Sequence, residues 1–435
     1  MLKYLRHFFI DGSNLFYAPN CDKSVKRFAL LFAIFALLGA SIGIPFSRDN
    51  AYYLMLIVCV GFLVYKGGIK ISTPFLVFYL IIIINVLIVD IPPIFKPMQR
   101  SILFILLTIV STSVMETEIA IRFRAYLFKY LIFGIIVISV GSFFCFFLGI
   151  NLMISNNIAA AYGGYATHGG WFSGLASHSM ILGPISMISA LTFYFLYQAK
   201  SRNIYLIFFF LSAMSTVFSA SRSSLLAIAI AIIYNLIAGH VNAAIRKKMI
   251  RILAITAILT IPISGVAFKG IINKQESREK QHSGLNSRQG KFDCRIAEFK
   301  SSPLFGVGFC AIDINGNDEF DPNEGRIEPG TSHLSVLSML GIIGFIAYIA
   351  ILYNGYKNTK SIHTLHSRFV FSCFLAFFVH AWFEGYILAG GGFLALIFWL
   401  ILGQCIDCPK AYLMVNRRAQ KEYRYIDHKP HTAQS

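Results

Sequence analysis

The sequence predicts an all-α polytopic integral membrane protein, with about twelve transmembrane helices and a large periplasmic loop between the ninth and the tenth. Of the 435 residues, 56% are hydrophobic and only 13% are charged, whereas soluble chains are about 25% charged. Apolar runs recur that approach the ~20 residues needed to cross a bilayer. Basic residues gather in alternate loops, as the positive-inside rule requires. These observations exclude a soluble multidomain protein and a disordered chain.

The elements follow in order along the chain. Residues 1–27 are basic, and no small-residue cleavage site follows the first apolar run, so we expect a cytoplasmic N-terminus that acts as a retained signal anchor. Residues 28–268 hold nine predicted spans and residues 333–404 hold three, before a cytoplasmic tail at 405–435. The spans are predicted at 28–46, 51–65, 74–89, 101–115, 130–154, 179–199, 204–220, 223–239, 252–268, 333–354, 369–386 and 388–404.

The charge distribution fixes the orientation. With twelve spans every second loop is cytoplasmic, and these loops and the two termini hold most of the 38 Lys and Arg residues. The net charge of +18 is therefore explained by topology, and no nucleic-acid partner is needed. We expect both termini in the cytoplasm, membrane lipids as surroundings and an active site on the periplasmic side.

Two outer segments are candidates for function. Residues 269–332 form the large periplasmic loop, which is polar and too short for a sizeable core of its own. Loops of this length are usually functional or disordered. Residues 155–178 are rich in Gly and aromatic residues and uncharged. This segment suits either a carbohydrate-contacting loop or an ordinary interfacial aromatic belt.

Two arginines are candidate anion ligands. Arg222, in F-S-A-S-R-S-S-L-L-A, lies at the predicted outer turn between spans seven and eight. It can bind an anion, with the serines donating further hydrogen bonds, or anchor the interface. Arg288, in L-N-S-R-Q-G-K-F, is either a solvated loop residue or a second ligand. A short amphipathic helix is predicted after it, in I-A-E-F-K-S-S-P-L-F-G-V-G-F, stopped by Pro303.

His333 is the candidate catalytic base. It follows Thr331 and Ser332, which can cap a helix, so we expect the imidazole in the first turn at the outer surface. A positive helix N-terminus favours a neutral imidazole, which can take a proton from a hydroxyl. The alternative is a histidine packed in a polar helix end.

Three further residues have supporting roles. Glu384, in H-A-W-F-E-G-Y, is the one acidic residue in a predicted span, and His380 lies one turn earlier and can pair with it. Glu384 can equally be the structural partner of an arginine such as Arg222 or Arg100. His178, at the outer start of span six, has both a functional and a structural interpretation.

The order of these motifs resembles the O-antigen ligase and polymerase superfamily, whose members act on undecaprenyl-diphosphate-linked glycans outside the bacterial inner membrane. The motifs are S-A-S-R-S-S, then N-S-R-Q-G-K-F with E-F-K-S-S-P-L-F-G-V-G-F, then H-L-S-V-L-S-M-L-G-I-I-G-F. The resemblance covers about residues 155–350 by motif and the whole chain by topology. It implies that Arg222 and Arg288 bind the donor diphosphate and that His333 activates the acceptor hydroxyl.

We therefore predict a glycosyltransferase that moves a glycan from undecaprenyl diphosphate to an acceptor sugar hydroxyl, as a ligase. A polymerase of the same superfamily, with another lipid-linked glycan as acceptor, needs the same donor site. A lipid or polysaccharide transporter is the alternative from another class, although no internal repeat is found. A sugar diphosphate is already an activated donor, so we expect no cofactor or metal and one-step inversion.

Two other patterns concern metals and redox chemistry. The acidic residues at 313–324 follow the spacing of a calcium loop, but Asp318 stands where that loop needs Gly, so a solvated turn is favoured. Cys294 and Cys310 share the periplasmic loop and could form a disulfide in that oxidising compartment.

Overall fold

The computed structural model describes residues 15–41 apart from 18 and 20, and then 50–152, 172–238, 247, 286–313 and 330–427. The predicted ninth span and most of the large loop lie outside the described residues. So do most of the Gly- and aromatic-rich segment and all of the acidic turn except Asp313. The predictions made for those segments therefore stay predictions.

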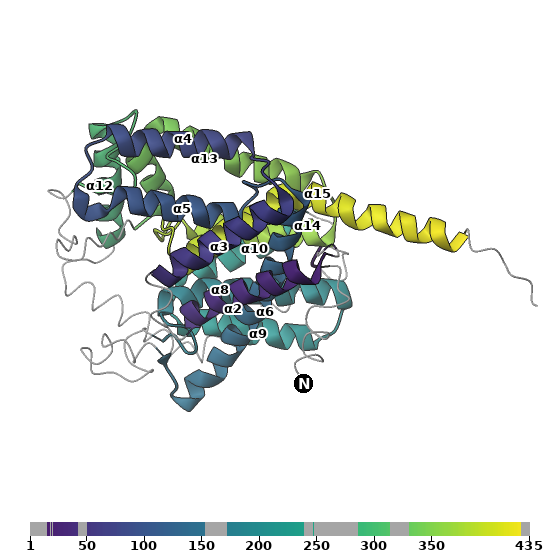
Figure 1. Ribbon diagram of the computed structural model, residues 1–435. Helices are drawn as coiled ribbons and strands as arrows, with labels where there is room; N and C mark the ends of the chain where they lie inside the picture. Colours follow the sequence, from purple (N-terminus) through teal and green to yellow (C-terminus); the bar gives the residue numbers. More distant parts are fainter. Residues whose placement is uncertain are drawn as a thin grey trace, which may run out of the picture.

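The described part of the chain is a bundle of helices without a β-strand (Figure 1). Six of its helices are long and apolar enough to cross a membrane, and five shorter helices are also apolar. The all-α membrane fold is thereby confirmed, and the count of twelve spans stays a prediction. The helices are α2 (Lys23–Ser41), α3 (Asn50–Gly67), α4 (Thr73–Ile88), α5 (Pro97–Ser111), α6 (Glu118–Leu148), α8 (Ser179–Lys200), α9 (Ile204–Phe218), α10 (Arg222–Ile237), α12 (Asn286–Ser301), α13 (Ser332–Lys360), α14 (Leu365–His380) and α15 (Phe393–Asp427).

Local sequence signals explain where several helices begin and end. The hydroxyl of Thr117 accepts a hydrogen bond from the backbone of Ala120 and caps α6, which ends where Gly149 takes a left-handed conformation with φ 69°. Thr364 and Ser367 form a reciprocal capping box at the start of α14. α14 ends at His380, six residues before the predicted end of that span. The following turns, over 381–392, contain four glycines.

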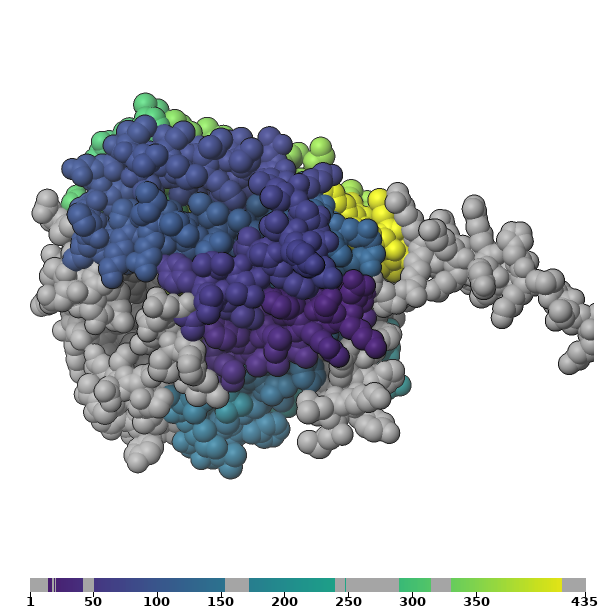
Figure 2. Space-filling model, in the orientation of Figure 1, coloured from purple at the N-terminus to yellow at the C-terminus, as the bar shows by residue number. Residues whose placement is uncertain are grey.

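The bundle has two ends that Figure 1 separates clearly. α12 lies at one of them, which we call the α12 end, and α15 runs out of the bundle at the other, which we call the tail end. α8 lies deepest, because every residue from Leu182 to Tyr197 is buried. Figure 2 shows α2 to α5 covering one face of the molecule. In α3 and α4, the large apolar side chains of Leu54 and Leu87 are more than 60% exposed, which is typical of a surface that faces lipid.

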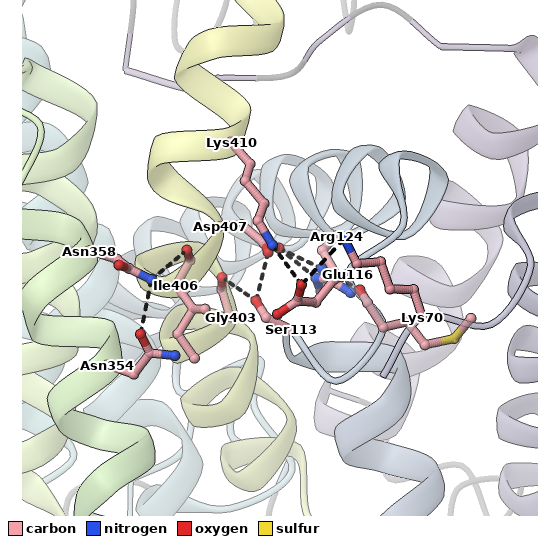
Figure 3. Close-up of polar contacts among 11 residues, drawn as sticks. Lys70, Ser113, Glu116, Arg124, Asn354, Asn358, Gly403, Ile406, Asp407 and Lys410 are labelled. Carbon is pink, nitrogen blue, oxygen red and sulfur yellow. Dashed lines mark hydrogen bonds and ion pairs between the residues drawn. The ribbon is translucent and has the colours of Figure 1, made fainter. Parts of the chain in front are cut away.

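A buried ion pair joins α6 and α15 near the tail end (Figure 3). The Nε atom of Arg124 donates to Oδ2 of Asp407 over 2.7 Å, and Ser113 donates to the other carboxylate oxygen, also over 2.7 Å. Both charged side chains are almost completely buried. The sequence predicts Arg124 in a cytoplasmic loop and Asp407 in the tail, and it gives no sign that the two residues pair inside the bundle.

Candidate functional site

α13 is broken at Gly341, within the first third of its length. Gly341 has φ 64° and ψ −168°, a conformation that is essentially confined to glycine. The N–H of Ile342 consequently donates to the carbonyl of Pro303 over 2.8 Å, outside the helix. The short piece Ser332–Leu340, which carries His333, is therefore separated from the rest of α13 by a gap in its hydrogen bonding.

The backbone that follows α12 fills this gap. The N–H of Val307 donates to the carbonyl of Ser338 over 2.9 Å, and the N–H of Gly308 donates to that of Met339 over 3.1 Å. These carbonyls lost their helical partners at the break, so residues 303–308 replace the missing turn. A Cβ atom on Gly306 would lie 2.4 Å from the backbone carbon of Met339. The P-L-F-G-V-G-F and M-L-G-I-I-G-F motifs are thus two sides of one contact.

Asn85 fixes that contact from α4. Its side chain is 1% exposed. The amide nitrogen donates to the carbonyl of Phe305 over 2.5 Å and to that of Met339 over 3.3 Å. The amide oxygen accepts the N–H of Phe309 over 2.7 Å. One buried side chain therefore joins the inserted segment to the end of the short helical piece.

A second buried ion pair lies in α12, at the end of the bundle opposite to Arg124 and Asp407. The predicted amphipathic helix is confirmed, and it ends at Ser301, just before Pro303. The side chains of Arg295 and Glu298 are 2% and 3% exposed, and Nη2 of Arg295 lies 2.6 Å from Oε1 of Glu298. Glu298 also accepts the N–H of Asp313 over 2.9 Å, and burial raises the pKa of its carboxyl despite the opposing effect of Arg295. Through Glu298, the pair joins α12 to the chain beyond the inserted segment, at Asp313.

A cavity of about 370 Å³ opens at the α12 end beside the short helical piece of α13. Arg100 at the start of α5 is the only charged residue among the described residues that line it. Ser332 and Ser335 add hydroxyl groups, and the rest of the lining is mainly apolar residues and the glycine-rich turns after α14. Such a lining suits a ligand that is largely apolar and carries an anionic group.

Ser332 shapes one wall of this cavity. Its hydroxyl donates to the carbonyl of Glu384 over 2.6 Å and accepts the N–H groups of Tyr386 and Ile387 over 2.9 and 3.2 Å. The backbone N–H of Ser332 donates to the carbonyl of Ala381 over 2.8 Å. The first residue of α13 therefore holds the chain that follows α14. This role of Ser332 was not predicted, because its partners lie about fifty residues away in the sequence.

His333 lies in the first turn of α13 as predicted, but its ring is 2% exposed. Nε2 lies 2.9 Å from the carbonyl oxygen of Phe378, so this nitrogen carries the proton and donates. Nδ1 then has the lone pair, and it accepts the hydroxyl of Tyr348 over 3.0 Å. The ring also packs against Trp382. The imidazole is therefore held in one neutral tautomer with its basic nitrogen turned toward Tyr348.

Arg222 begins α10, and its side chain is exposed. Beside it, Ser221 and Ser224 share a hydrogen bond of 2.7 Å. α8 approaches closely here, since a Cβ atom on Gly183 would lie 2.4 Å from the side chain of Ser221. Arg288 lies in the first turn of α12 rather than in a loop, and its side chain is outside the described residues. The predicted pairing of the two arginines therefore stays a prediction.

The supporting residues take distinct places. Arg100 lines the cavity. His178 caps α8, because its Nδ1 accepts the N–H of Met180 over 3.0 Å, which is the structural interpretation. Glu384 is predicted inside the eleventh span, but α14 ends at His380 and Glu384 follows it. Its side chain is half-buried. Nδ1 of His380 lies 3.2 Å from the hydroxyl of Tyr386.

Cys294 and Cys310, the two cysteines of the predicted periplasmic loop, are not joined by a disulfide in the structure. Cys294 is half-buried in α12 and Cys310 is buried beside the cavity. Burial raises the pKa of the Cys310 thiol to about 12.

Many of the contacts described above involve one segment of the chain, and a known family matches that segment. Residues 207–352 match the family model of the O-antigen ligases. This match supports membership of the O-antigen ligase superfamily. The matched segment runs from α9 through the break in α13 and includes Arg222, Arg288 and His333. A comparison with curated proteins gives no match.

Proposed function

We propose that this protein transfers a glycan from undecaprenyl diphosphate to an acceptor sugar hydroxyl, on the periplasmic face of the bacterial inner membrane. The observation that carries the proposal is the family match over residues 207–352, which contains both candidate arginines and the candidate base. We favour a ligase, with lipid A-core or a similar glycan as acceptor. A polymerase would use the same donor site with a lipid-linked acceptor.

In the proposed donor site, Arg222 and Arg288 bind the diphosphate. Arg222 supports this because it is exposed at the N-terminus of α10, where the helix dipole and free N–H groups favour an anion. A guanidinium can bind a phosphate through two hydrogen bonds. The apolar cavity with Arg100 in its lining suits the lipid-linked part of the donor.

In the proposed reaction, the acceptor oxygen attacks the anomeric carbon of the donor sugar while the bond to the diphosphate oxygen breaks. The electron pair of that bond leaves with undecaprenyl diphosphate, whose charge the arginines stabilise. The proton of the acceptor hydroxyl goes to Nδ1 of His333. The hydrogen bond from Nε2 to Phe378 supports this role, because it leaves Nδ1 as the basic nitrogen. The acceptor hydroxyl replaces the hydroxyl of Tyr348 at Nδ1.

The test is to replace Arg222, Arg288 and His333 by alanine one at a time and to assay glycan transfer in membranes of a deletion strain. We expect His333→Ala to lower the rate about 10²- to 10⁴-fold, the usual contribution of a positioned base. Arg202→Ala is the matched control, since Arg202 is exposed between α8 and α9 and has no role in the site. Full activity in all three variants would refute the proposed site.

The acceptor is identified by the glycans of the deletion strain. If the chain is a ligase, all glycan attached to the acceptor is lost. Loss of long chains with retention of one attached unit indicates a polymerase instead. Unchanged transfer with altered export of the lipid-linked donor would indicate a transporter.

A further inference from the structure

A second cavity lies at the tail end of the bundle, far along the helices from the proposed glycan site. It has a volume of about 180 Å³ and lies between the C-terminal ends of α10 and α13 and the start of α14. Three basic residues line it, one from the end of α13, one from the connection and one from α14: Lys360, His363 and Arg368. None of the described residues that line it is acidic. The described part of the lining therefore carries positive charge, from Lys360 and Arg368, and no negative charge.

Neutral donors complete the polar wall of this tail-end cavity. Asn235 of α10 lines it and is 4% exposed. The amide oxygen of Asn235 accepts the hydroxyl of Tyr194 over 3.1 Å and the amide of Gln198 over 2.9 Å. Because the amide oxygen already accepts these two hydrogen bonds, Asn235 can donate hydrogen bonds to a ligand in the cavity through its amide N–H groups. Ser367 also lines the cavity, and its hydroxyl is held in the capping box of α14.

Another part of the lining is aromatic, and exposed apolar side chains lie nearby. Phe371 lines the cavity and packs against Tyr234 and Tyr356, with ring centroids 5.1 and 5.8 Å apart. Close by on α10, Ile237 is 78% exposed. A ligand that fits both parts of the lining has an anionic group joined to apolar chains. Basic pockets between transmembrane helices bind phospholipid headgroups through this combination.

We propose that the tail-end cavity binds the phosphate group of an anionic phospholipid such as phosphatidylglycerol. Arg368 is half-buried and can bind the phosphate through two hydrogen bonds. Lys360, whose ammonium now lies 4.9 Å above the ring of Tyr356, supplies a second charge from the rim. In the predicted orientation the lipid comes from the cytoplasmic leaflet. The site is independent of the glycan-transfer proposal.

The test is native mass spectrometry of the full chain, purified in detergent and titrated with phosphatidylglycerol or with phosphatidylethanolamine. We expect tighter binding of phosphatidylglycerol. Lys360→Gln and Arg368→Gln should each weaken its binding about fivefold, which is the usual contribution of one basic residue at an anionic surface. Lys357→Gln is the matched control, because Lys357 is exposed one turn earlier on α13 and does not line the cavity.

Two further measurements keep the outcome unambiguous. Thermal unfolding of each variant checks the fold, and the exposed side chain of Lys360 can be changed without disturbing the core. Inorganic phosphate is added as a competitor: if excess phosphate fails to displace the lipid, the lipid is the ligand. The proposal is overturned if both variants bind phosphatidylglycerol as the unchanged protein does, or if phosphate alone binds as tightly as the lipid.

Discussion

Arg124 and Asp407 form a buried ion pair across 283 residues of sequence. Arg124 also donates to the carbonyl of Met115 over 3.0 Å, and Ser113 binds the partner carboxylate. The loop between α5 and α6 is therefore drawn into the same network (Figure 3). This network ties the first half of the bundle to α15, its last helix.

Breaking this pair should destabilise the bundle strongly. Arg124→Ala or Asp407→Ala leaves a buried charge without its partner, which costs about 3–5 kcal/mol. We expect a clearly lower unfolding temperature in detergent for each single variant. An Arg124→Leu/Asp407→Leu double variant should recover most of the loss, because neither charge remains.

An exposed pair in the same network is the control. The ammonium of Lys410 lies 3.0 Å from a carboxylate oxygen of Glu116, and both side chains are partly exposed. Lys410→Ala should therefore cost at most about 1 kcal/mol. Equal losses for Lys410→Ala and Arg124→Ala would show that burial does not control the effect.

The contact made by Asn85 should be sensitive to the loss of its amide group. Asn85→Ala leaves the N–H of Phe309 and the carbonyl of Phe305 without the partners they have now, and we expect a loss of about 2–4 kcal/mol in stability. Asn85→Asp keeps the acceptor for Phe309 but buries a carboxyl group against the carbonyls of Phe305 and Met339, so its loss should be at least as large. Thermal unfolding measures the loss of stability in each variant. Glycan transfer, assayed at a temperature where both variants are folded, shows whether the contact also affects activity.

The glycine at the break should not tolerate a side chain. A Cβ atom on Gly341 would lie 2.2 Å from the carbonyl oxygen of Leu304, and its φ of 64° adds backbone strain. We expect Gly341→Ala to lower both stability and glycan transfer. Gly61→Ala is the control, since Gly61 lies in α3 with no atom within 4 Å of its Cβ position, and alanine favours a helix. Equal behaviour of the two variants would contradict the described packing.

Thiol labelling tests the state of the two cysteines in the predicted periplasmic loop. N-ethylmaleimide should label Cys294, which is half-buried, and spare Cys310, which is buried. Because burial raises the pKa of Cys310 to about 12, its thiolate stays scarce up to about pH 9 and its labelling stays slow until the protein unfolds. If Cys294 labels only after reduction, the cysteines are disulfide-bonded in the membrane.

Replacing Tyr348 tests whether His333 takes the proton of the acceptor hydroxyl. In the proposed reaction an acceptor hydroxyl takes the place of the Tyr348 hydroxyl at Nδ1 of His333. Tyr348→Phe should therefore keep substantial glycan transfer, while His333→Ala removes it. If the phenylalanine variant is as inactive as the alanine variant, the proton does not pass directly to His333. Thermal unfolding separates this outcome from a loss of fold.

Much of the helical framework could be predicted from composition, because each described apolar run forms a helix. The limits are less accurate, since α6 begins 12 residues before its predicted span and α15 continues 23 residues beyond its own. The end of α12 followed from Pro303. His333 lies in the first turn of α13 as predicted, although the hydroxyl of Thr331 makes no capping hydrogen bond. Predictions failed where polar residues are used inside the bundle. Arg124 looks like an ordinary loop cation, and only the fold brings Asp407 to it.

The candidate site was predictable only in part, for the same reason. Asn85 stands alone in the run I-I-I-I-N-V-L-I, and a single polar residue in an apolar span was the one signal available for it. Arg295 and Glu298 are three apart on a helix, which more often indicates a solvated surface pair. Their burial depends on the inserted segment, which no local pattern specifies.

The break in α13 also imposes a length rule on the chain. Residues 303–308 bridge the break in the helix, and the backbone at both ends of this segment is hydrogen-bonded to α13. One residue added or removed between Pro303 and Gly308 would therefore shift these hydrogen bonds out of register. A stretch that resembles a variable surface loop is therefore as restricted in length as a turn of helix, and the position of His333 depends on that restriction.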